Sequence, residues 1–99
     1  MSGILAALTL PASTTTDIYE CPAGNTVTAI VSCANTSGLQ CQVRLSVQPF
    51  GGTAKVIEPD SDLKIRGVLD RGGIVLGAGD KIIGFCNQAI DVAVWGYKE

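Results

Sequence analysis

The 99-residue chain is apolar and sparsely charged, with 46% hydrophobic and 16% charged residues, whereas soluble domains carry about 25% charged residues. Its length fits one domain, and a net charge of −2 without a basic cluster gives no electrostatic support for binding nucleic acid. No run approaches the roughly 20 apolar residues that cross a bilayer. We therefore expect one domain that binds neither nucleic acid nor membrane and has apolar surface left for protein partners.

The first 13 residues are uncharged and rich in aliphatic side chains. They lack the positively charged start of a secretory signal. We predict an apolar N-terminal arm or edge strand over residues 1–13 and a single domain over residues 14–99. As an arm, the segment would add a strand to a neighbouring chain. The predicted interface residues in it are Ile4, Leu5, Leu8 and Leu10.

Strands are expected at residues 17–21, 26–34 and 40–48, because apolar and polar residues alternate there between Gly, Pro and Asn positions. In the second of these strands Val27, Ala29, Val31 and Cys33 share one face, and Thr28, Ile30 and Ser32 share the other. The short polar connection at residues 35–38 predicts that the second and third strands form an antiparallel hairpin.

The second half of the chain begins with three carboxylates at alternate positions, Glu58, Asp60 and Asp62. We interpret them as a solvated acidic loop; a calcium site or a carboxylate pair for hydrolysis are the alternatives. Further strands are predicted at residues 63–69, 74–76 and 81–86, with a tight turn at residues 77–80.

The last predicted strand, residues 90–97, places Ile90, Val92 and Val94 on one side as a core stripe. Trp95 and Tyr97 then lie on the opposite side, where aromatic residues are typical of protein interfaces. The alternative is a change of register near Gly96 that would bury Trp95 in the core.

Seven to eight short antiparallel strands with this spacing predict an all-β chain that forms a single β-sandwich, jelly-roll-like or immunoglobulin-like. No stretch of ten or more residues shows helical periodicity with caps.

The chain has four cysteines and no histidine, and no two cysteines have C-x-x-C spacing. We interpret Cys21, Cys33, Cys41 and Cys86 as buried free thiols, with disulfides or a thiolate metal site as alternatives. No nucleophile with a neighbouring base is recognisable, so we expect no catalytic residues, no cofactor, no metal and no enzyme activity.

Three segments together resemble small β-sandwich structural proteins of tailed bacteriophages, including cyanophages: DIYECPAGNTVT (residues 17–28), GVLDRGGIVLGAGDKI (67–82) and VWGYKE (94–99). The resemblance implies a virion component assembled in the host cytoplasm, such as a capsid decoration or cement protein. A closed homotrimer or homodimer in contact with a major capsid protein is the expected assembly. A tail, neck or baseplate protein, or a carbohydrate-binding module, are the alternatives.

Overall fold

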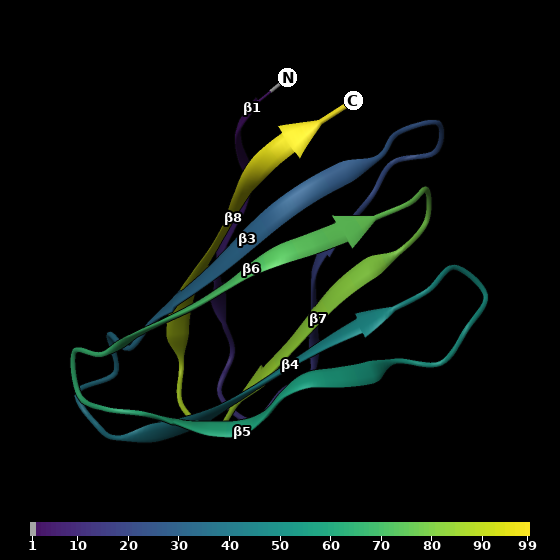
Figure 1. The fold of residues 1–99 in the computed structure, drawn as a ribbon. Helices are drawn as coiled ribbons and strands as arrows, with labels where there is room; N and C mark the ends of the chain where they lie inside the picture. Colours follow the sequence, from purple (N-terminus) through teal and green to yellow (C-terminus); the bar gives the residue numbers. More distant parts are fainter. Residues whose placement is uncertain (1) are drawn as a thin grey trace.

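Eight strands form two antiparallel four-stranded sheets that face each other, as a computed structural model of the chain shows for residues 2–99 (Figure 1). The strands are β1 (Ser2–Leu10), β2 (Thr16–Glu20), β3 (Val27–Ala34), β4 (Cys41–Gln48), β5 (Lys55–Leu63), β6 (Val68–Leu76), β7 (Lys81–Cys86) and β8 (Ile90–Lys98). One sheet has the order β1-β8-β3-β6 and the other β2-β7-β4-β5. The predicted β-sandwich is therefore confirmed.

The strand order is that of a jelly roll. Among consecutive strands only β4 and β5 lie in the same sheet, where they pair with each other. Each of the other connections crosses from one sheet to the opposite sheet. An eight-stranded jelly roll consists of two sheets whose strands are connected as two Greek keys. Of the two architectures expected from the sequence, the jelly roll is the one observed.

The core lies between the sheets and follows the alternation of the sequence. In β8 the stripe of Ile90, Val92 and Val94 is at most 2% exposed, as predicted. Val27, Ala29, Val31 and Cys33 of β3 are also buried, which confirms their predicted inward face. They share this face because strand residues two apart point to the same side of a sheet. The other fully buried side chains include Leu10, Val43, Leu45 and Ile82, together with all four cysteines.

The predicted hairpin between β3 and β4 is wrong, because the two strands lie in opposite sheets. Asn35, at the end of β3, holds the crossing connection in place. Its side-chain amide donates hydrogen bonds to the carbonyl oxygens of Leu39 (2.7 Å), Lys64 (3.0 Å) and Leu63 (3.2 Å). The β3–β4 connection is thereby tied to the β5–β6 turn, and the polar residues that suggested a hairpin turn support a crossover between sheets.

The predicted acidic loop and the strand after it are also corrected. Glu58, Asp60 and Asp62 lie within β5, which ends at Leu63, and the predicted strand at 63–69 is mostly the turn that leads into β6. β5 is an edge strand with its outer side in solvent, so charged residues are tolerated there. The turn predicted at residues 77–80 is present between β6 and β7.

The N-terminal segment forms the edge strand β1, which pairs with β8 of the same chain from Ser2↔Tyr97 to Leu10↔Ile90. Residues 2–10 thus extend the chain's own sheet instead of reaching out as an arm. The two ends of the described chain consequently lie side by side (Figure 1). Within residues 2–99 no helix has the length and apolarity needed to span a membrane.

Candidate interaction surface

The outer face of the β1-β8-β3-β6 sheet carries a row of large apolar side chains. The strand register aligns Ile4 of β1 with Trp95 of β8, and Trp95 with Ile30 of β3. All three point away from the core, with exposures of 75%, 37% and 38%. Directly opposed residues on one face of a sheet have their Cβ atoms about 5 Å apart, so the three side chains form one continuous ridge.

A second row lies one step further toward the chain termini. Here Tyr97 of β8 is paired with Thr28 of β3, and Thr28 with Val75 of β6. Tyr97 is 49% and Val75 is 65% exposed. We call the surface made by Ile4, Ile30, Val75, Trp95 and Tyr97 the apolar face.

Glycines beside the two rows keep part of the apolar face hollow. Gly3, Gly73 and Gly96 line an open depression of about 670 Å³ together with Ile4, Thr28, Ala29, Ile30, Trp95 and Tyr97. In the bulge of β6, Gly73 has a φ of +72°, which glycine adopts without steric cost. The depression therefore presents aromatic and aliphatic side chains beside exposed backbone.

In the next row on the other side of the ridge the outward residues are small. Ala7 is paired with Ala93, and Ala93 with Ser32. Charge enters this face only at its margin: among the described residues Asp70, opposite Ser32, and Asp91 point outward, and Asp91 accepts a 2.9 Å hydrogen bond from Thr9. The central rows hold no charged side chain.

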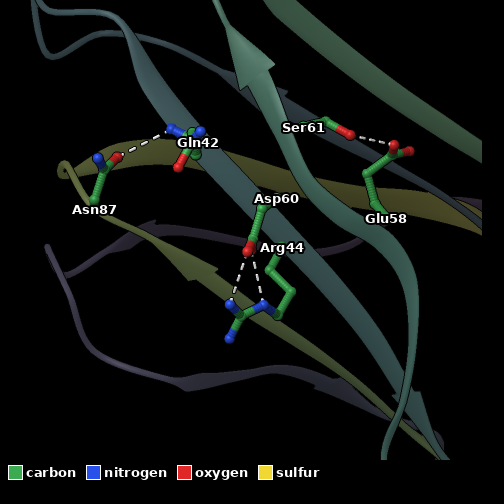
Figure 2. A network of polar contacts seen from close by, with 6 residues as sticks. All are labelled: Gln42, Arg44, Glu58, Asp60, Ser61 and Asn87. Carbon is green, nitrogen blue, oxygen red and sulfur yellow. Dashed lines mark hydrogen bonds and ion pairs between the residues drawn. The ribbon is translucent and has the colours of Figure 1, made fainter.

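The outer face of the other sheet carries ion pairs, of which Arg44–Asp60 is drawn in Figure 2. The Arg44 guanidinium donates two hydrogen bonds to Asp60, at 2.8 and 2.9 Å, and lies over the Phe85 ring. Hydrogen bonding to Arg44 lowers the pKa of the Asp60 carboxyl below its usual value. Lys81 forms ion pairs with Asp17 and Glu20 at the same surface. The two faces of the sandwich thus differ, since one is charged and the other apolar.

All four edge strands are interrupted by irregular pairing. The register shifts in β1–β8, β2–β7, β3–β6 and β4–β5, whereas the two central pairings, β3–β8 and β4–β7, are continuous. Bulges twist a strand and disrupt the ladder, which hinders the addition of a strand from another chain. The faces of the sandwich are therefore better suited to protein contact than its edges.

The predicted interface residues are distributed unequally between this surface and the core. Ile4, Trp95 and Tyr97 lie together on the apolar face. Leu5 and Leu8 are half-buried against the chain's own core, and Leu10 is fully buried within it. Leu10 is buried because it points inward opposite Ile90. It therefore cannot contact a partner chain, and its prediction as an interface residue is wrong.

Ile30 and Val75 belong to the apolar face but were not among the predicted interface residues. The alternation in β3 did place Ile30 on the outward side with Thr28 and Ser32. What the sequence does not contain is the pairing of β3 with β8, which brings Ile30 beside Trp95.

The acidic residues of β5 are engaged with other side chains. Asp60 binds Arg44, and Glu58 accepts a hydrogen bond from Ser61 (Figure 2). Asp62 accepts a hydrogen bond from Gln42, and Glu58 also forms an ion pair with Arg71. Within residues 2–99 no three His, Cys, Asp or Glu side chains are placed to hold a metal ion. The positions of these carboxylates are explained by the pairing of β4 with β5.

The four cysteines are free and buried. Burial, assisted by neighbouring thiols and carboxylates, raises the pKa of Cys33 to about 12. Burial also raises the pKa of Cys41 to about 12, with a further contribution from a hydrogen bond to Cys86. These thiols remain protonated near neutral pH and behave as small apolar core residues.

No family model matches the sequence, and no curated protein matches it significantly. A solved chain from the structure of infectious bursal disease virus, Gx strain, aligns with 96% of this chain at 13% identity and a TM-score of 0.46. The alignment covers 31% of that chain, so this protein spans about a third of its length.

Proposed function

We propose that this protein is a non-enzymatic structural subunit of a bacteriophage particle, a decoration protein bound to the capsid in many copies. The observation that carries the proposal is the exposed row Ile4–Trp95–Ile30, on a face without central charges. Exposed apolar side chains of this size gain free energy when a partner removes them from water, and Trp and Tyr are the residues that contribute most at interfaces.

The virion assignment rests on the sequence resemblance at residues 17–28, 67–82 and 94–99. The jelly roll adds support by analogy, because viral capsid domains are among the proteins that use it. Fold analogy alone does not define a function, and lectins share this architecture.

The absence of an enzymatic role is supported by the chemistry of the side chains. The chain contains no histidine. The carboxylates of β5 are engaged in ion pairs and hydrogen bonds, and burial keeps the Cys33 and Cys41 thiols protonated. A general base or activated nucleophile requires a group that titrates near neutral pH or lies beside a base.

A carbohydrate-binding role fits the apolar face less well. Trp95 and Tyr97 offer aromatic surface, but Thr28 is the one side chain with a hydrogen-bonding group among the other residues that line the depression. Sugar binding requires several polar partners that fix the orientation of hydroxyl groups.

Binding to particles from which this chain has been removed tests the proposal. We expect the purified protein to rebind in a fixed copy number, and Trp95→Thr to weaken binding at least tenfold. Threonine keeps the preference for a strand while removing the indole. Val56→Thr is the matched control, because Val56 is exposed on the other sheet, and it should bind like the wild type.

Gold labelling of rebound particles then locates the protein. Label over the capsid shell supports decoration, and label confined to the tail, neck or baseplate replaces that part of the proposal. Failure to bind any particle, combined with clear hits on a glycan array, would reject the structural role in favour of a carbohydrate-binding module.

A further inference from the structure

We infer that the partner on the apolar face is a second copy of this chain, packed face to face about a two-fold axis that runs parallel to the strands between β3 and β8. This inference rests on the proposed function, in which the apolar face contacts protein. It adds the identity of the occupant and the geometry of the contact. The particle then binds the dimer through other surfaces, and Trp95→Thr weakens that binding because a single chain offers one attachment site in place of two.

Shape is the first argument, and it follows from the strand order. A two-fold axis between the two central strands places β8 of one copy over β3 of the other, and β1 over β6. Ile4, the most exposed residue of the ridge, then meets the part of β6 where Gly72 and Gly73 form a bulge beside Ile30. A protruding side chain on one copy thus faces a position without side chains on the other, and this occurs twice.

At the centre of the same arrangement Trp95 of one copy covers Ile30 of the other. Trp95 is 37% and Ile30 is 38% exposed in the single chain, although they lie in the middle of a sheet. Sheets packed face to face lie about 10 Å apart with their strands within about 30°, which is the distance that such side chains fill. The contact resembles the packing that the same sheet already makes on its inner side.

Charge is the second argument. Asp70 and Asp91 are the outward carboxylates of this face, in rows beyond the ridge. The proposed axis places Asp91 over Ala34 of the other copy, and Asp70 over Ala7. No carboxylate of one copy then lies directly opposite a carboxylate of the other, which would be destabilising. The two Asp91 side chains lie diagonally across the axis at the margin of the contact, and each accepts a hydrogen bond from Thr9 of its own chain.

The edges supply the third argument. Because each edge pairing contains a bulge, two copies are hindered from joining into one continuous sheet. The remaining way for this sheet to bury its apolar residues against an identical chain is face to face, as an isologous dimer.

Light scattering coupled to size-exclusion chromatography tests the inference. We expect the wild type to have the mass of two chains, and Ile4→Lys and Trp95→Thr to have the mass of one. Val56→Lys, which introduces the same charge on the other sheet, should remain a dimer. Urea denaturation of each variant confirms that a change in mass is not caused by unfolding.

Cross-linking tests the geometry independently of any loss of affinity. Two single variants, Ile4→Cys and Gly72→Cys, are mixed with a short bismaleimide, one of them carrying a tag that distinguishes its mass. Both positions are accessible, and a Cβ at Gly72 makes only an ordinary 3.6 Å contact with Ile30. The expected product is the mixed covalent dimer, whereas Val56→Cys mixed with Gly72→Cys should give little.

The outcomes separate this inference from the proposed function. A wild type that stays monomeric up to its solubility limit overturns the inference, while its binding to particles would leave the proposed function intact. A dimer that does not bind particles supports the inference and rejects the proposed function. A dimer that survives Trp95→Thr and Ile4→Lys uses another surface and also overturns the inference.

Discussion

Gly96 of β8 lies so close to Thr28 of β3 that a Cβ atom at Gly96 would be 1.9 Å from the Thr28 carbonyl oxygen. The obstacle is backbone, so it cannot move aside as a flexible side chain would. We expect Gly96→Ala to lower the free energy of unfolding by about 3 kcal/mol, because overpacking forces the two central strands apart. Urea denaturation measures this change.

Gly72→Ala is the control for this prediction, since a Cβ there has room beside Ile30 and the backbone needs no special conformation. It should change stability by less than about 1 kcal/mol. Equal effects of the two substitutions would show that the close approach of β8 to β3 is not a stabilising requirement.

Asn35 stabilises the crossover between β3 and β4 through three hydrogen bonds to backbone carbonyl oxygens. We expect Asn35→Ala to reduce stability by about 3 kcal/mol, because buried carbonyl groups lose their donor. Ser37→Ala removes a hydroxyl that donates to the Asn35 side chain and accepts from the Leu39 N–H, both in the β3–β4 connection, and should cost about 1 kcal/mol. A smaller loss for Asn35→Ala than for Ser37→Ala would contradict the role assigned to the amide.

The Arg44–Asp60 pair predicts a pH-dependent contribution to stability. The folded-state pKa of Asp60 is lowered by the Arg44 hydrogen bonds, so the contribution is present above the pKa of the unfolded carboxyl. It is lost as the pH falls through the lowered folded-state pKa. We expect Asp60→Asn to lower the melting temperature slightly at pH 7, and the difference from wild type to vanish at strongly acidic pH.

Asparagine is a suitable replacement because Asp60 has a φ of +47°, a conformation that Asn tolerates better than most residues. The effect is small, since the pair is exposed to solvent and screened. A difference that persists unchanged at acidic pH would mean that the backbone conformation, not the ion pair, is responsible.

The buried thiols predict slow reaction with alkylating reagents. With a pKa of about 12, Cys33 and Cys41 hold almost no thiolate at pH 8, and they are inaccessible. We expect labelling to follow the rate of unfolding in the native protein. An exposed thiol introduced by Val56→Cys should react orders of magnitude faster, and native cysteines that match it would refute the assignment.

The same thiols set an alkaline limit to stability. Their pKa is raised on folding from an ordinary 9.0, so the folded state retains protons that the unfolded state releases. The contribution of these thiols to the free energy of unfolding is complete below about pH 9 and is lost as the pH rises from 9 toward 12. Cys33→Ala should flatten this decline in urea denaturation measured across that range.

The alternation of apolar and polar residues predicts which side chains of a strand point inward. It does not predict which strands pair with each other. The core stripes of β3 and β8 and the outward position of Trp95 follow from a period of two. The pairing of β3 with β8 and the placement of β4 in the other sheet do not, because both depend on long-range packing. β5 was not predicted as a strand, because three carboxylates at alternate positions are typical of a solvated loop. In the structure one of them, Asp60, binds Arg44 on the adjacent strand.

The candidate surface was predictable in the same partial way. Trp95, Tyr97 and Ile4 could be selected because they are large apolar residues at outward or uncharged positions. Leu10 has the same chemistry in the same segment but points inward, and the bulge between Ile4 and Ala6 changes which residues of β1 face solvent. A bulge of this kind leaves no clear mark in the sequence.

The pairing of the first strand with the last has a consequence for synthesis on the ribosome. β1 can find its partner only after the residues of β8 have left the exit tunnel, so its aliphatic side chains remain exposed until then. Such non-local pairing slows folding and favours capture of the nascent chain by chaperones. A chain that stops short of Ile90 deprives both β1 and β3 of a neighbouring strand.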